Sequence, residues 1–162
     1  KGQTSPRSAA GFVTKSTPGG AIEPSLKPLE VALTAGSTFV AQGFSTDIKE
    51  LTALIEAGLN HKGFSFINVF SPCVTYNKVN TYDWFKENLT KLSDIEGYDS
   101  SNRQLAMQTV MQREGLVTGI VYHDKETKSY QEKVVGYSEI PLTDIDISLS
   151  EDQFSAIVKE FM

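Results

Sequence analysis

Cys73 is the residue whose side chain could take part in the largest number of reactions, and it is the only cysteine in the 162 residues. A thiolate can act as a nucleophile, ligate a metal or simply fill a small apolar space, and the residue types alone leave all three open. A single cysteine excludes an internal disulfide and a metal site built from this chain's thiolates alone. A nucleophilic thiol also needs an imidazole base. The two histidines, His61 and His123, fall at an expected helix end and strand end, where His61 is interpreted as a C-terminal cation and His123 as a solvated side chain.

Other candidate groups are weaker. Asp144 and Asp146 lie two apart in an alternating stretch, so a strand there would place both on one face, opposite the apolar residues. That pattern is typical of solvated edge charge. Gly19 and Gly20 match no phosphate-loop motif, because no Gly-Lys-Ser/Thr or GxGxxG sequence follows a strand. From chemistry alone, the sequence predicts a soluble α/β domain with one notable cysteine.

Composition and charge exclude some classes of binding partner. With 40% hydrophobic and 22% charged residues the chain has globular composition, and its net charge of −5 argues against a nucleic-acid partner. No apolar run is long enough for a membrane helix. The acidity is concentrated in residues 139–162, which hold six acids and one lysine. The single cysteine and the lack of a visible export signal predict a cytoplasmic location.

The first half of the chain predicts alternating helices and strands after an irregular loop over residues 1–27. Residues 64–70 are apolar at nearly every position, which is typical of a strand covered on both faces. The order helix, strand, helix, strand predicts a parallel sheet with right-handed crossovers. The expected elements are a helix from Pro28 to Gly36, a strand at 38–41 ended by Gly43, a helix over 48–59 capped by Ser45 or Thr46 and ended by a left-handed Gly63, and the strand 64–70.

The second half predicts two further helices, a third strand and an acidic extension. The segment Ser71-Pro72-Cys73 follows the 64–70 strand directly, at the edge where open α/β sheets bind ligands. We expect two regions, an α/β domain over 1–123 and an extension over 124–162. The expected elements are helices over 81–92 and 100–114, the latter capped by Ser100 or Ser101, a strand over 116–122, a polar hairpin-like stretch over 125–135, an alternating stretch over 141–149 and an amphipathic helix over 151–161.

Two segments carry a family resemblance. Residues 1–8 read Lys-Gly-Gln-Thr-Ser-Pro-Arg-Ser, and residues 61–84 include Ser71-Pro72-Cys73. Together they closely resemble the β subunit of 2-oxoacid:ferredoxin oxidoreductases, especially the 2-oxoglutarate type, and the resemblance extends from residue 1 to about 123. It implies the C-terminal part of a thiamin-diphosphate-binding, Rossmann-like α/β fold, with a mostly parallel sheet flanked by helices and truncated at its N-terminal side.

The resemblance also implies cofactors, partners and site residues. The family oxidises a 2-oxoacid with coenzyme A and passes electrons through a [4Fe-4S] cluster to ferredoxin, in complex with an α subunit. Its Ser-Pro-Cys cysteine is the last of four cluster ligands, which matches Cys73. The loop that matches Lys1, Gly2, Gln3 and Thr4 lies near thiamin diphosphate and its Mg2+.

The departures from the family set further expectations. The other three cluster cysteines and the metal-binding elements of the family precede the position of Lys1, and one thiolate cannot hold a four-iron cluster. We therefore expect the isolated chain to bind neither cofactor, to be inactive, and to form a homo-oligomer through its bared sheet edge. The alternative is a non-catalytic interaction or assembly module with Cys73 as a buried thiol. A third reading, a thiol hydrolase, requires an imidazole within hydrogen-bond reach of Cys73.

Overall fold

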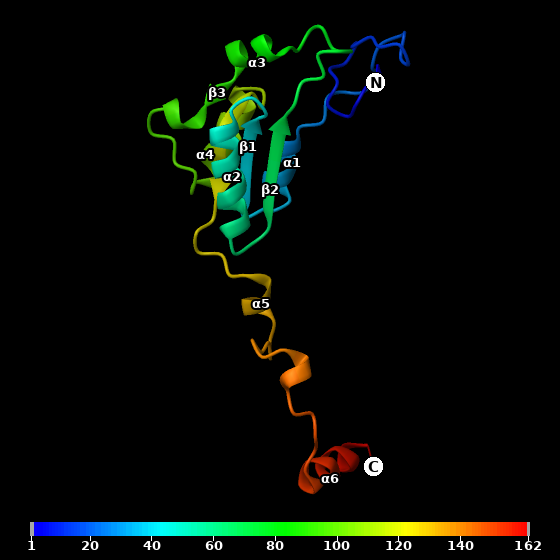
Figure 1. Cartoon of the computed structure of the whole chain (residues 1–162), viewed down its shortest axis with the longest axis vertical. Coiled ribbons are helices and arrows are strands. Elements are labelled where there is room, and N and C mark those ends of the chain that lie inside the picture. The colour runs from blue at the N-terminus through cyan, green and yellow to red at the C-terminus, as the bar shows by residue number, and fades with distance from the viewer. Residues whose placement is uncertain (1, 162) are drawn as a thin grey trace. The chain divides into compact units, whose positions relative to one another are not determined.

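The computed structural model describes residues 2–161, and its contacts divide the chain into two compact units, 1–130 and 131–162. The first unit holds the sheet and its covering helices (Figure 1). Within the described residues, no helix is both long enough and apolar enough to span a membrane.

The sheet of the first unit has four strands in the order β2-β1-β4-β3. β1 pairs in parallel with β2, starting with Phe39 opposite Ser65, and β3 pairs in parallel with β4. The predicted mostly parallel α/β architecture is therefore confirmed, but the central β1–β4 pair is antiparallel, with a bulge between Val40 and Ala41. A short apolar run looks the same in either direction, so the sequence does not reveal this reversal. The strands are β1 (Phe39–Phe44), β2 (Ser65–Phe70), β3 (Thr90–Lys91) and β4 (Val117–His123).

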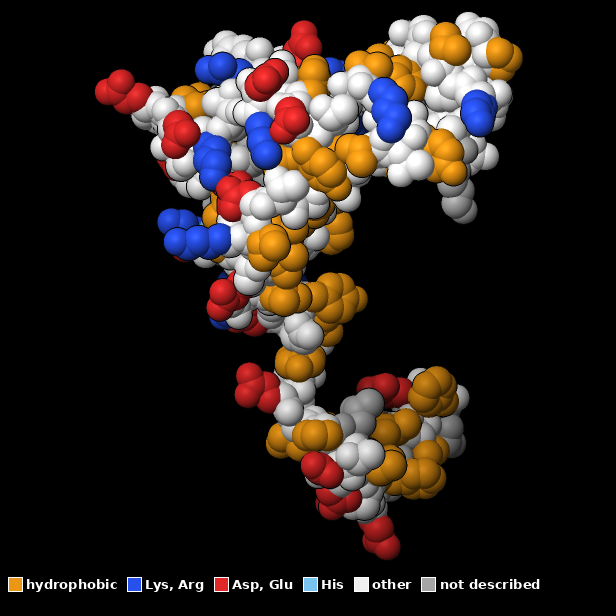
Figure 2. All heavy atoms as spheres, turned by 45° about the horizontal axis from the view of Figure 1, so that its top comes forward, with side chains coloured by type: hydrophobic (Ala, Val, Ile, Leu, Met, Phe, Trp, Pro, Cys, Tyr) orange, Lys and Arg blue, Asp and Glu red, His pale blue; other side chains and the backbone are white. Residues whose placement is uncertain are grey.

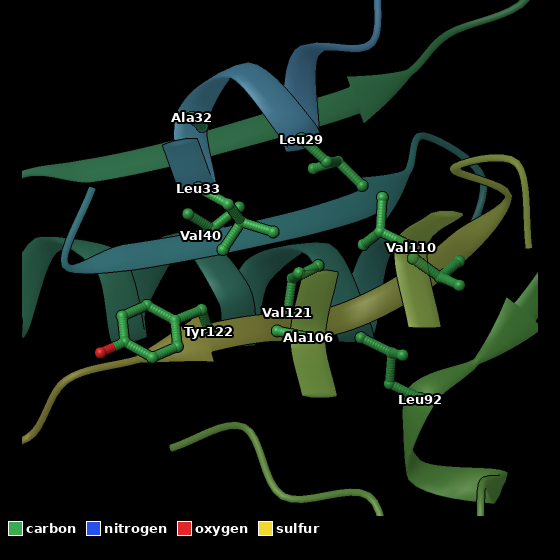
Figure 3. Close-up of a cluster of buried hydrophobic side chains, with 10 residues drawn as sticks. Leu29, Ala32, Leu33, Val40, Leu92, Ala106, Val110, Val121 and Tyr122 are labelled. Carbon is green, nitrogen blue, oxygen red and sulfur yellow. The ribbon is translucent and has the colours of Figure 1, made fainter. Parts of the chain in front are cut away.

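Two helical layers cover the sheet. Val40 points to the face covered by α1 (Pro28–Thr34) and α4 (Arg103–Gln112), where it packs in a cluster that includes Leu33 and Val110 (Figure 3). Its neighbours Phe39 and Ala41 point to the opposite face and pack against Leu54 of α2 (Ile48–Asn60). This alternation buries every residue of β1.

β2 is less buried than its sequence predicts. Only Phe70 is fully buried in this strand, and Val69 is 40% exposed. The reason is position, because β2 lies at the edge of the sheet in the described residues and β1 lies inside it. α2 nevertheless approaches β2 closely, since a β-carbon added to Gly58 would come within 2.7 Å of the Ile67 Cδ1 atom.

Several predicted helix ends are wrong by a few residues. α2 is capped by Asp47, whose carboxylate accepts a hydrogen bond from the Glu50 amide at 3.1 Å, and not by Ser45 or Thr46. Its C-cap, His61, has extended backbone, and Gly63 is not left-handed, so the predicted glycine cap is absent.

The later helices show the same kind of error. The predicted helix over 81–92 is shorter, α3 (Tyr82–Asn88), and is followed by β3 and a short 3-10 helix at Leu92–Asp94. α4 is capped by Asn102, whose side chain accepts hydrogen bonds from two backbone amides. The Ser101 hydroxyl instead donates a hydrogen bond to the Asp99 carboxylate. Neighbouring polar residues compete for the capping position, and their side-chain partners decide the outcome.

Two predictions for the acidic extension are wrong. The hairpin-like stretch over 125–135 contains a short helix, α5 (Tyr130–Lys133), and the alternating stretch contains a 3-10 helix (Leu142–Asp144) in place of a strand. Asp144 and Asp146 therefore share no sheet face. Alternation makes a strand only where a neighbouring strand can pair with it, and none does among the described residues. The terminal helix is confirmed as α6 (Glu151–Glu160), with a capping box between Ser150 and Gln153.

Arg103 joins the two helices on one face of the sheet. Its guanidinium donates hydrogen bonds to the carbonyl oxygens of Leu33 (2.6 Å) and Ser37 (2.8 Å), and its Cζ lies 4.1 Å from the centre of the Tyr122 ring. We expect Arg103→Ala to lower the free energy of unfolding by roughly 3 kcal/mol, since it removes a cation–π contact and two charge-assisted hydrogen bonds. Chemical denaturation measures this change. The exposed Arg113→Ala is the matched control, and equal effects of the two variants would contradict the assignment.

Candidate functional site at the carboxyl end of the sheet

The N-terminal loop has no regular helix or strand, as predicted, but it is folded by its own hydrogen bonds. The Gly11 amide donates to the Ala21 carbonyl at 2.7 Å, and the Leu26 amide donates to the Pro6 carbonyl at 2.7 Å. The Ser25 hydroxyl also donates to the carbonyl of Arg7 at 2.8 Å. These bonds close the loop on itself, so it can present fixed backbone and hydroxyl groups.

This loop contacts the end of β2. The Arg7 guanidinium lies 5.1 Å from the centre of the Phe70 ring, and burial lowers the Arg7 pKa, although an arginine remains charged at any working pH. A β-carbon added to Gly2 would lie 3.8 Å from a ring carbon of Tyr76. The start of the chain therefore lies against the segment that follows β2 (Figure 1).

Cys73 lies in that segment and is exposed. Its carbonyl accepts hydrogen bonds from the amides of Tyr76 (3.3 Å) and Asn77 (2.9 Å), which makes a turn immediately after the thiol. The Asn77 side chain in turn accepts hydrogen bonds from the amides of Val79 and Asn80. The turn holds Cys73 at the carboxyl end of β2, where the sequence places it. The buried thiol of the alternative reading is not what the structure shows.

A cluster of aromatic rings packs against the carboxyl ends of β1 and β2. Phe44 and Phe70 are the last residues of β1 and β2, and both pack on Phe85 of α3, with ring centres 5.6 and 4.7 Å away. Close packing of these rings at the strand ends fixes the position of the loops that follow β1 and β2.

An open cavity of about 410 Å³ lies within the N-terminal loop. Its size is in the range of small-ligand sites, and hydroxyl groups are prominent in its lining. The lining residues are Thr4, Ser5, Pro6, Ser8, Thr17, Gly20, Ala21, Ile22, Glu23 and Pro24. Of the four residues predicted near the cofactor, Thr4 lines the cavity, Gly2 is half-buried beside Tyr76, Gln3 is exposed, and Lys1 lies outside the described residues.

The described residues do not by themselves make a metal site. Residues 2–161 contain no group of three or more His, Cys, Asp and Glu side chains that could hold a metal ion. A [4Fe-4S] cluster takes four cysteine thiolates and Mg2+ takes oxygen ligands, so the one thiolate of this chain could supply at most one of the four cluster ligands, and the described residues complete neither site.

The histidines lie at the other end of the sheet. His61 precedes β2 and its ring lies 5.5 Å from that of Phe39, the first residue of β1, while the His123 ring lies 5.2 Å from both. Cys73 lies three residues beyond Phe70, the last residue of β2, and a strand of this length spans roughly 20 Å. No imidazole of this chain is therefore near the thiol, which removes the base that a thiol hydrolase needs.

His61 is also not the exposed C-terminal cation that its sequence position suggests. Its Nε2 atom lies 2.8 Å from the Thr38 hydroxyl. Burial, followed by repulsion from His123, lowers the His61 pKa, and burial followed by repulsion from Lys125 lowers the His123 pKa. Both imidazoles are thus neutral packing groups at neutral pH.

We expect this pair to make stability pH-dependent. Because both folded-state pKa values are lowered, the unfolded chain binds more protons, so the free energy of unfolding falls as pH drops below about 6.5. Thermal melts between about pH 7.5 and pH 5 measure the loss. A His61→Gln/His123→Gln variant should show a flatter profile over this range, and an unchanged slope would contradict the role of the pair.

Sequence reasoning missed Arg7 as a contact between the loop and β2. It stands in a basic, turn-rich stretch where such residues are usually solvated, and no periodicity marks it. Only the folded loop brings it to Phe70.

Comparison with known proteins agrees with the resemblance. Residues 73–139 match the sequence family that describes the C-terminal region of the pyruvate ferredoxin oxidoreductase beta subunit, so the match begins at Cys73. A 2-oxoacid:ferredoxin oxidoreductase subunit beta from a Sulfolobus species is 31% identical over 144 residues, 83% of this chain and 47% of that protein. A 2-oxoglutarate oxidoreductase subunit KorB from Mycobacterium tuberculosis is 38% identical over 77 residues, 48% of this chain and 21% of that protein.

A solved structure shares the fold. The 2-oxoglutarate:ferredoxin oxidoreductase from Magnetococcus marinus, with 2-oxoglutarate, coenzyme A and succinyl-CoA bound, superposes with a TM-score of 0.72 at 30% identity. The superposition covers 99% of this chain and 47% of the other. The chain thus spans about half the length of the Sulfolobus relative and of this structure. On the sequence matches and the shared fold, the chain is similar over most of its length to the β subunits of 2-oxoacid:ferredoxin oxidoreductases.

Proposed function

We propose that this chain is part of the β subunit of a 2-oxoglutarate:ferredoxin oxidoreductase, which decarboxylates the 2-oxoacid oxidatively with coenzyme A and passes the electrons to ferredoxin. The observation that carries the proposal is the likeness to the Magnetococcus marinus enzyme over 99% of this chain. The similarity to KorB proteins supports 2-oxoglutarate over pyruvate as the substrate.

Within that enzyme we assign two roles to this chain. Cys73 supplies one thiolate to a [4Fe-4S] cluster, since it is exposed near the carboxyl end of β2 and lies in the Ser-Pro-Cys segment that resembles the family. The N-terminal loop, including Thr4, borders the thiamin diphosphate and its Mg2+, since hydroxyl groups line its cavity. The cluster, when bound, carries electrons one at a time.

The remaining ligands come from other segments of the subunit. One thiolate is a quarter of the cluster's ligand set, and the described residues offer no group of metal-binding side chains for Mg2+. We therefore expect the 162 residues alone to bind neither cofactor and to show no turnover, and the α subunit to be required for activity.

The test is reconstitution. The complete β subunit that contains this chain is expressed with its α subunit, and reduction of ferredoxin is measured with 2-oxoglutarate and coenzyme A. We expect turnover that depends on both compounds and is slower with pyruvate. Faster turnover with pyruvate would overturn the substrate assignment, and absence of turnover with any 2-oxoacid would overturn the function.

A further inference from the structure

The terminal helix α6 carries an apolar face that is largely exposed among the described residues. Phe154, Ile157, Val158 and Phe161 recur at the three- and four-residue spacing that places them on one side of a helix. Their exposed fractions are 59%, 44%, 38% and 85%. No residue over 151–161 is buried. Hydrophobic side chains gather on the surface of the C-terminal unit (Figure 2).

Such a helix needs a packing partner to be stable. A ten-residue helix is marginal in water, and most helix stability in proteins comes from burying an apolar face. Local features do favour it, because the Ser150 hydroxyl accepts from the Gln153 amide at 3.2 Å and the Gln153 side chain accepts from the Ser150 amide at 3.0 Å. The capping box thus favours the helix locally, while its apolar face remains exposed in the described residues.

The net charge of residues 131–162 restricts which kind of surface can bind the apolar face of α6. Residues 131–162 hold seven acidic and two basic residues, whereas residues 1–130 hold thirteen of each, so the whole net charge of −5 belongs to the C-terminal unit. On α6 itself Glu151, Asp152 and Glu160 outnumber Lys159. Two copies of this unit repel each other, and the neutral first unit offers no net opposite charge.

The same charge argues against a lipid surface. Helices that lie on anionic membranes carry lysine and arginine on their polar face, and the polar face of α6 is acidic. A complementary partner has an apolar groove with basic side chains at its rim, which is the helix-in-groove mode of recognition.

We propose that α6 docks through Phe154, Ile157, Val158 and Phe161 into an apolar groove with a Lys/Arg rim on the α subunit of the same oxidoreductase. The identity of that partner rests on the proposed function. The apolar face supplies the affinity, and the acidic flanks supply orientation and speed of association.

The test measures binding of the complete β subunit that contains this chain to purified α subunit by surface immobilisation. We expect Phe154→Ala and Phe161→Ala each to weaken binding about tenfold or more, because alanine keeps the helix but removes a buried aromatic anchor. Ser155→Ala, on the polar side, is the matched control and should bind like the wild type. Added salt should slow association of the wild type, since the rim contacts are electrostatic.

Other outcomes overturn the docking. They are equal binding of wild type and the two phenylalanine variants, salt-independent association, and failure of the wild type to bind the α subunit. Light scattering that shows α6-dependent dimers would assign the face to a second copy, and pelleting with phosphatidylcholine/phosphatidylglycerol vesicles would assign it to a membrane. Turnover separates the two proposals: active enzyme with α6-independent binding overturns only the docking, and α6-dependent binding without turnover overturns only the function.

Discussion

Replacing Cys73 with serine is expected to remove the iron–sulfur cluster from the assembled enzyme and to lower ferredoxin reduction by more than about 100-fold. A serine hydroxyl is a poor ligand for iron in such clusters, and no second cysteine of this chain can take its place. Iron and sulfide analysis, together with the visible absorbance of the purified αβ complex, measures the loss.

The control for this variant uses the exposure of the thiol. Because Cys73 is exposed, Cys73→Ser should leave the melting temperature of the isolated chain unchanged. Val74→Ser, at the next position and 39% exposed, should leave both iron content and turnover near the wild-type values. A Cys73→Ser complex that retains its full iron content would show that the thiol is not a ligand.

Replacing Gln42 with leucine is expected to lower the free energy of unfolding by about 3 kcal/mol, although leucine has nearly the same volume. Gln42 is fully buried, and its amide nitrogen donates to the carbonyl oxygens of Gly115 (2.7 Å) and Val117 (2.6 Å). Its amide oxygen accepts from the Asn68 side chain at 2.5 Å. Leucine leaves the buried Val117 carbonyl and the part-buried Gly115 carbonyl and Asn68 amide without this partner, and an unsatisfied buried polar group costs more free energy than its hydrogen bond contributes.

The geometry explains why a polar residue stands in the middle of the sheet. The β1–β4 ladder ends where Gln42 lies opposite Gly119, and the Gln42 side chain bonds to carbonyls of the chain just before that point. Urea denaturation of Gln42→Leu and of the exposed Gln112→Leu provides the comparison, with the second variant near wild type. A Gln42→Leu chain as stable as the wild type would mean that the side-chain amide adds nothing to this junction.

The sequence predicted which elements exist better than where they end or how they pair. The spacing of Leu51, Leu54 and Ile55 was enough to locate α2, because an apolar stripe at helical period is rarely compatible with a strand or a loop. The cap at Asp47 was missed since three polar residues in a row can each cap a helix, and only tertiary contacts choose among them. The antiparallel β1–β4 pair was missed because strand direction depends on the path of the whole chain.

The candidate site was predictable in part. Cys73 was expected after a buried strand, and the structure has it, exposed, beyond the carboxyl end of β2, although β2 is only partly buried and the role of Cys73 as a ligand stays a prediction. The interpretations of His61 as a C-terminal cation and of His123 as a solvated side chain are wrong, because the contacts of both rings with the Phe39 ring join segments far apart in the sequence. The same limit hid the contact between Arg7 and Phe70.

The mixed pairing of β1 has a consequence for the order of folding. β1, α2 and β2 are consecutive in the sequence and form one β-α-β crossover unit. β4 can pair with β1 only after the chain from Phe44 to Val117 has closed into a long loop. Closing that loop costs chain entropy before any contact is gained, so we expect the transition state to contain the crossover and the arrival of β4 to set the folding rate.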